Sequence, residues 1–140
     1  MKPFAIWLAI VAVVFGGYAL FTVATRETTR VFVYVDVSQP MERVWSQTRR
    51  ELDRIDDRDH AEFSLAIGRR NTNDLVHSWQ SSLRLPAGER PFAPCNLSSA
   101  AAFDEAADAD ERILVTVGDS TCLTDGLRAE LTDWTIVELG

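Results

Sequence analysis

The sequence predicts an α/β fold: a three-layer α/β/α domain with a mostly parallel central sheet, preceded by one transmembrane helix. Two observations support this prediction. Residues 4–25 carry no charge and are largely apolar. After them, β-branched strand patterns alternate with amphipathic helical patterns, as is typical of parallel sheets covered by crossover helices. With 46% hydrophobic and 25% charged residues, the chain has a globular composition rather than a disordered one.

This pattern divides the 140-residue chain into three parts. Residues 4–25 form the expected transmembrane helix, residues 26–29 a short linker, and residues 30–140 the folded domain. The last part holds about 110 residues, which suits one domain and is too short for two. We therefore expect a single folded unit attached to one membrane helix.

The N-terminal segment has the length of a membrane anchor. As a helix, residues 4–25 would extend roughly 33 Å, which matches a bilayer core. A cleaved signal peptide is the alternative, with Ala24 before the cut and Thr22 two positions earlier. The apolar run is long for a signal peptide, so we favour a single-pass signal-anchor in the cell membrane, with residues 4–25 in contact with the lipid bilayer.

The orientation of this anchor depends on a near balance of charges. Lys2 precedes the apolar segment, and Arg26 and Arg30 follow it. Because the tail before the segment is only a few residues long, it is most easily left in the cytoplasm. The folded domain is then expected to be extracytoplasmic.

The first half of the domain reads as strand, helix and strand. Val31–Val35 is β-branched and aromatic throughout, as expected of a strand covered on both faces. Met41–Ile55 has helical periodicity, with Ser38 as a candidate cap and Pro40 suited to the first turn. Ala61–Ile67 is a second strand, ended by a glycine.

The second half continues this alternation. Its expected elements are an edge strand at Leu75–Leu83, a proline-rich loop at Pro86–Cys95, a helix from Asn96 to about Ala107, a strand at Arg112–Val117, a helix carrying Leu127 and Leu131 that Thr121 or Thr124 can cap, and a last strand at Trp134–Leu139. The chain as given stops at Gly140, directly after that strand. We therefore expect a short version of the fold that lacks a final helix.

Candidate site residues follow two of the strands. Asp36 and Ser38 come directly after the first strand, and Asp119 and Ser120 come after Val117. In open α/β sheets, ligands bind beyond the carboxyl ends of the strands, where the strand order reverses. Carboxylate and hydroxyl oxygens at such a position are ligands that Mg²⁺ or Mn²⁺ accepts.

The first strand and its turn, Val31–Met41, resemble the strand and D-x-S-x-S metal loop of von Willebrand factor A domains. Asp36 and Ser38 match this loop, whereas Pro40 occupies its last serine position. Three further segments resemble the family: Asp59–Gly68 its second strand, residues 95–101 the loop and helix start that usually offer a threonine, and Ile113–Asp119 the strand that ends in an aspartate. The resemblance covers residues 30–140 and implies a domain that binds protein partners.

The departures from this family concern its metal-ion-dependent adhesion site. Pro40 has no hydroxyl, and Cys95 or Asn96 stands where a threonine oxygen is expected. Asp36, Ser38 and Asp119 remain, so the resemblance implies a degenerate site with no cofactor, or at most weakly bound Mg²⁺. The competing interpretation makes Asp36 and Ser38 turn and cap residues that bond local backbone, and we favour it.

The two cysteines, Cys95 and Cys122, each fall in a loop beyond the carboxyl end of a strand. In an exported domain, two cysteines are more often paired than free. A disulfide between them is therefore expected if the domain is exported. A nucleophilic cysteine is the weaker alternative, because neither His60 nor His77 has an evident route to a thiol.

These observations favour a membrane-anchored, non-catalytic module with an unknown protein partner. The formal net charge of −7 argues against a nucleic-acid partner, because phosphate binding needs a basic surface. A Mg²⁺- or Mn²⁺-dependent adhesion domain is one alternative. A phosphatase-like hydrolase with Asp36 as nucleophile is another, although such a site would want a second aspartate at the position of Ser38.

Overall fold

The folded part of the chain is α/β and is built on one mostly parallel sheet. A computed structural model describes residues 2–24, 27–69, 73–118 and 121–140. The strands are β1 (Thr29–Val35), β2 (Ala61–Gly68), β3 (Asn73–Gln80), β4 (Glu111–Val117) and β5 (Thr135–Leu139). They lie in the order β3-β2-β1-β4-β5. β1, β2, β4 and β5 are parallel, and β3 pairs antiparallel with β2. The sequence predicted the mostly parallel sheet and the edge position of β3, but not its antiparallel direction.

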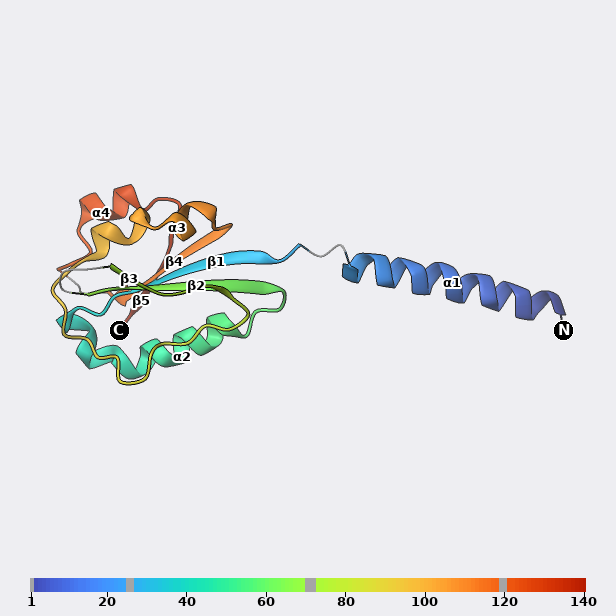
Figure 1. Ribbon diagram of the computed structural model, residues 1–140, viewed down its shortest axis with the longest axis horizontal. Helices are drawn as coiled ribbons and strands as arrows, with labels where there is room; N and C mark the ends of the chain where they lie inside the picture. The colour runs from blue at the N-terminus through green and yellow to red at the C-terminus, as the bar shows by residue number, and fades with distance from the viewer. Residues whose placement is uncertain (1, 25–26, 70–72, 119–120) are drawn as a thin grey trace.

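Helices pack against both faces of this sheet. The α-helices are α1 (Lys2–Ala24), α2 (Trp45–Asp56), α3 (Asp104–Asp108) and α4 (Asp125–Glu130), and the 3₁₀ helices are η1 (Gln39–Val44) and η2 (Leu97–Ala102). Alternate residues of β1 point to opposite faces. Val31 and Val33 pack in one apolar cluster with Leu52 of α2, whereas Phe32 packs in another with Leu127 of α4. Figure 1 shows α2 on one side of the sheet and α3 and α4 on the other.

Two predicted helices are shorter than expected. The segment predicted as one helix from Met41 to Ile55 begins as a 3₁₀ turn and becomes α-helical only at Trp45, a common arrangement at helix starts. The helix predicted from Asn96 to Ala107 is divided into η2 and the short α3. Ser99 Oγ donates to the Asn96 carbonyl at 2.9 Å, and such local bonds compete with α-helical pairing.

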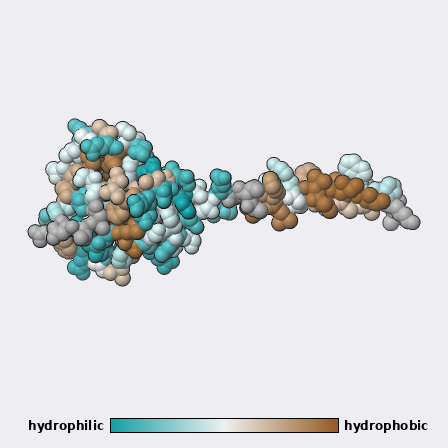
Figure 2. Space-filling model, turned by 45° about the horizontal axis from the view of Figure 1, so that its top comes forward, coloured by the Kyte–Doolittle hydropathy of each residue, from teal (hydrophilic) through white to brown (hydrophobic). Residues whose placement is uncertain are grey.

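α1 is long and apolar enough to span a bilayer, and none of its apolar stretch is buried in the folded part. Figure 2 shows this contrast: α1 is largely hydrophobic along its length, while hydrophilic residues dominate the visible surface of the folded part. A helix with no polar face fits hydrocarbon on all sides.

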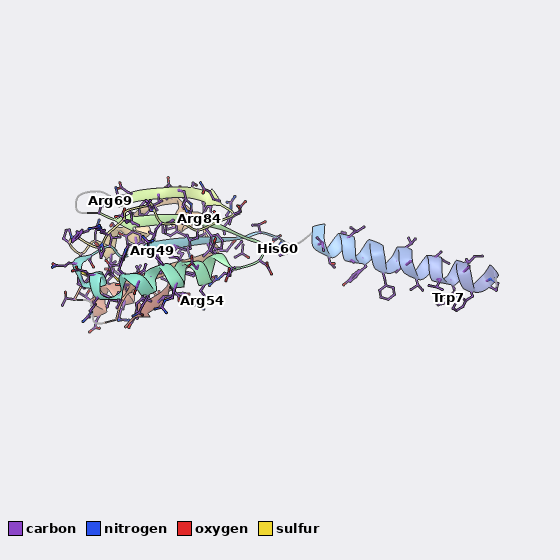
Figure 3. The ribbon with its side chains drawn as sticks, turned by 90° about the horizontal axis from the view of Figure 1, so that it is seen from below. Trp7, Arg49, Arg54, His60, Arg69 and Arg84 are labelled. Carbon is purple, nitrogen blue, oxygen red and sulfur yellow. A yellow bond between two sulfur atoms is a disulfide. The ribbon has the colours of Figure 1, made fainter. Side chains whose placement is uncertain are left out.

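The carboxyl edge of the sheet lies at the end of the domain opposite α1. α1 ends at Ala24 and β1 begins at Thr29, so the chain between them reaches at most about 18 Å. Figure 3 places His60, which precedes β2, toward α1, and Arg69, which follows β2, at the far end. Because β1, β2, β4 and β5 are parallel, all four end at that far edge.

Candidate functional site

Asp36 stands at the carboxyl end of β1, next to β4, where the strand order reverses. Its side chain is only 2% exposed. Oδ1 accepts a hydrogen bond from the backbone N–H of Ser38 at 2.8 Å, and Oδ2 accepts one from Thr116 Oγ1 of β4 at 2.7 Å. The carboxylate therefore joins the turn after β1 to the neighbouring strand, and both of its oxygens have donors within the protein.

Ser38 is buried beside the disulfide bond that joins Cys95 and Cys122. Ser38 Oγ lies 3.6 Å from Cys122 Sγ, and because a disulfide sulfur carries no hydrogen, the hydroxyl is the donor. Ser38 occupies the position before η1, but its side chain makes no capping bond there. The predicted cap is wrong in this detail because the hydroxyl is turned toward the sulfur.

Residues 91–95, which we call the strap, lie alongside the turn that follows β1. The N–H of Gln39 donates to the Ala93 carbonyl at 3.1 Å, and the N–H of Ala93 donates to the Val37 carbonyl at 3.0 Å. The disulfide holds the end of the strap, with 5.2 Å between the Cα atoms of Cys95 and Cys122. Two backbone bonds and one covalent bond thus fix a segment that the sequence predicted only as a loop.

A buried tyrosine ties the neighbouring loop to the same edge. Tyr34 Oη donates to the Asn96 carbonyl at 2.6 Å. It reaches this carbonyl across Gly68, where a Cβ atom would lie 2.2 Å from the hydroxyl. Gly68 is therefore required at the end of β2, because a side chain at this position would overlap the Tyr34 hydroxyl.

Burial raises the pKa of Tyr34 to about 12. Desolvation is the main cause, and the negative charge of Asp36 also raises this pKa, whereas a hydrogen bond with Ser99 opposes the change. The hydroxyl is therefore protonated at physiological pH and acts as a donor.

The outer side of the strap differs from its inner side. Phe92 is 68% exposed, and in the described part of the folded domain the other exposed large hydrophobic residue is Leu75, at 37%. Arg90 is also exposed and has no hydrogen bond or ion pair with any described residue. Beside the strap, Gln39, Pro40, Glu42 and Arg43 line a surface hollow of about 570 Å³. The outer side thus offers apolar surface and an unused charge.

The predicted metal ligands do not form an open site in the described residues. Asp36 and Ser38 lie together, whereas Asp119 lies outside the described residues. No cluster of three or more His, Cys, Asp or Glu side chains suited to a metal ion occurs within residues 2–24, 27–69, 73–118 and 121–140. A cation at Asp36 would compete with the hydrogen bonds that Ser38 and Thr116 donate to this carboxylate.

The candidate site contains residues that sequence reasoning missed. Thr116 is buried in the strand predicted at Arg112–Val117, and its hydrogen bond with Asp36 depends on the parallel register of β1 and β4. Tyr34 and Gly68 come together between the paired strands β1 and β2, which no spacing along the chain reveals. Phe92 lies in the segment predicted only as a proline-rich loop, and its signal in the sequence was an aromatic residue between two prolines.

Comparison of the chain with family models, with curated proteins and with solved structures gave no match.

Proposed function

We propose that this protein is a membrane-anchored module that binds another protein and has no catalytic centre. Its folded domain is displayed outside the cytoplasm by α1. The observation that carries the proposal is the closed state of the carboxyl edge: Asp36 is buried, and both of its oxygens accept hydrogen bonds from the protein. The carboxylate at this edge serves instead to hold the turn after β1 to the strand β4.

The finer fold assignment is part of this proposal. We propose a three-layer α/β/α domain resembling von Willebrand factor A domains, with a degenerate metal site. Apolar clusters on both faces of the sheet support the three layers. The order β3-β2-β1-β4-β5, which reverses between β1 and β4, is that of a doubly wound sheet.

The alternatives both require an open carboxylate. A phosphatase-like hydrolase would need Asp36 to reach a substrate phosphorus, and a metal-dependent adhesion domain would need it to reach a cation. Either event would cost the hydrogen bonds from Ser38 and Thr116, and leaving such buried donors unpaired costs about 1–3 kcal/mol each. No feature of the described residues offsets this cost.

In-cell crosslinking followed by purification of the tagged full-length chain in detergent tests the proposal. We expect a protein partner to be captured by the wild type and, equally, by Asp36→Asn, because this variant keeps the shape of the edge and removes the charge that chemistry needs. Residues 1–29 fused to an unrelated domain serve as the control. Capture no greater than this control, or a phosphate-ester hydrolase activity that Asp36→Asn abolishes, would refute the proposal.

A further inference from the structure

We infer that the outer side of the strap is the partner-binding surface, and that it fits a protein with an apolar pocket for Phe92 and a carboxylate beside that pocket for Arg90. This inference rests on the proposed function and specifies the surface and the chemistry of the partner. Three observations carry it: the exposure of Phe92, the hydrogen bonds and disulfide that hold the strap, and the absence of an ion pair for Arg90 among the described residues.

Phe92 is exposed where the domain has few apolar side chains on its surface. Its 68% exposure compares with 0% for Phe32 and Phe63 in the core. Aromatic residues are enriched at protein interfaces and often supply most of the binding energy, by filling a pocket on the partner. The flanking Pro91 is buried and Ala93 is partly buried, so Phe92 is exposed on a segment whose neighbouring residues pack against the domain.

The strap presents Phe92 in a fixed backbone conformation. The neighbouring Ala93 is hydrogen-bonded through both its N–H and its carbonyl, at 3.0 and 3.1 Å. Three residues after Phe92, Cys95 is joined covalently to Cys122. A side chain presented on an ordered segment loses less conformational entropy when it binds. The disulfide therefore supports recognition by ordering the strap before the partner arrives.

The charge beside Phe92 selects the partner's chemistry. Arg90 is exposed and has no ion pair with any residue from 27 to 69, 73 to 118 or 121 to 140. The adjacent Glu89 forms an ion pair with Arg69, with 2.7 Å between Glu89 Oε2 and Arg69 Nη2. A carboxylate on the partner would complement Arg90 and guide the encounter.

The position of the strap argues against the bilayer as its occupant. The strap lies at the carboxyl edge, where it pairs with Gln39 and Val37 beyond the end of β1, whereas α1 joins the domain at the start of β1 (Figure 1). A strand of seven residues extends about 23 Å. The strap therefore lies at the end of the domain far from the point where α1 joins it, and this position favours a protein over the bilayer as its occupant.

Site-specific photocrosslinking of the full-length chain in its own cells tests this inference. The photoreactive residue p-benzoylphenylalanine replaces Phe92 in one variant, Leu75 in a second and the exposed Ala87 in a third. We expect an adduct with a different protein at position 92 and none at position 75. An adduct with phospholipid or with a second copy of this chain at position 92 would overturn the inference.

The crosslinking result also separates the inference from the proposed function. Protein adducts at position 75 or 87 without one at position 92 would refute the assignment of the binding surface to the strap, but not the proposal that the protein binds a partner. The absence of protein adducts at all three positions would overturn both.

Affinity measurements with the protein captured at position 92 test the assigned chemistry. Phe92→Ala should weaken binding at least tenfold, and Phe92→Leu should weaken it less. Arg90→Ala should weaken binding about threefold and reduce its dependence on salt. Leu75→Ala and Arg54→Ala are the matched controls, since Arg54 is already paired with Glu51. Binding by Phe92→Ala within twofold of the wild type would overturn the inference.

Discussion

The inner and outer sides of the strap use their side chains in opposite ways. On the inner side, Asp36, Ser38 and Thr116 are almost fully buried and hydrogen-bonded within the protein. On the outer side, Phe92 and Arg90 are exposed, and Arg90 has no partner among the described residues. Asp36 stands at the carboxyl edge of the sheet, where ligands bind in many open α/β folds, yet here it stabilises the fold. The surface available for recognition lies on the outer side of the strap.

Removal of the disulfide should have the largest effect on the inner side. Cys95 and Cys122 are 27 residues apart, and in the chain-entropy account a loop of this size stabilises a fold by about 3–4 kcal/mol. We expect the double variant Cys95→Ser, Cys122→Ser to lose this much free energy of unfolding, measured by denaturant titration of the full-length chain in detergent. A loss below about 1 kcal/mol would show that the strap is held without its covalent bond.

Asp36→Ala should come next. It leaves the Ser38 amide and the Thr116 hydroxyl without their acceptor, and we expect a loss of about 3 kcal/mol in the same denaturant titration. Asp36→Asn is the matched control. It keeps an oxygen for Ser38, and the Thr116 hydroxyl can turn to accept from the new amide, so its expected cost is about 1 kcal/mol. Equal, small losses in both variants would mean that the carboxylate does not join the two segments.

Alkaline pH should lower the free energy of unfolding through Tyr34, whose hydroxyl donates a hydrogen bond to the Asn96 carbonyl. Its folded pKa of about 12 lies above the ordinary tyrosine pKa of 10.0, so the folded state holds the proton more tightly than the unfolded state. The stabilisation is fully present below pH 10 and is lost between pH 10 and 12, by about 2–3 kcal/mol in total. We expect Tyr34→Phe to lack this alkaline loss, measured as the free energy of unfolding against pH. An unchanged alkaline loss in Tyr34→Phe would assign it to other groups.

Gly68→Ala should cost about 2 kcal/mol, because the new Cβ would overlap the Tyr34 hydroxyl. The double variant with Tyr34→Phe removes the closest contact and should recover part of this loss, measured as a coupling free energy in a double-mutant cycle. Additive losses would mean that Gly68 and Tyr34 are not in contact. Gly126→Ala serves as a control, since its Cβ would meet no atom closer than 4.0 Å.

Phe92→Ala should have the smallest effect on stability and thereby sharpen the contrast between the two sides. Because its ring is exposed, we expect the free energy of unfolding to change by less than about 0.5 kcal/mol. The measurement is the same denaturant titration that is applied to Asp36→Ala. A loss above about 1 kcal/mol would show that the ring packs against the domain, and that its exposure is not available for a partner.

The fold was largely accessible from the sequence because its strands have strong local signals. The β-branched run at Val31–Val35 identified the central strand, and Thr124 does cap α4 by accepting from the N–H of Leu127. The division of the helices around Pro40 and Ser99 was less predictable. A 3₁₀ turn is common at a helix start, and the hydrogen bond from Ser99 to the Asn96 carbonyl competes with α-helical pairing.

The candidate site was accessible only in part. The positions of Asp36 and Ser38 followed from the rule on strand ends. Asp36 bonds the local backbone at Ser38, as the favoured interpretation expects, whereas the Ser38 side chain does not cap the following helix. The partners of these residues did not follow, because Thr116 and the strap come from distant parts of the chain. The exposure of Phe92 depends on the strap's pairing with Gln39 and Val37, which arises only in the folded chain.

The most direct test of the closed carboxyl edge is hydrogen exchange of three backbone amides in the full-length chain in detergent. The N–H groups of Ser38, Gln39 and Ala93 donate to Asp36, Ala93 and Val37 respectively. We expect these amides to be protected to a degree approaching that of the Asp36 amide, which donates to Val115 in the sheet, and to be unchanged by millimolar Mg²⁺. Exchange as fast as that of the exposed Ala87 amide, or protection that appears only with Mg²⁺, would contradict the account.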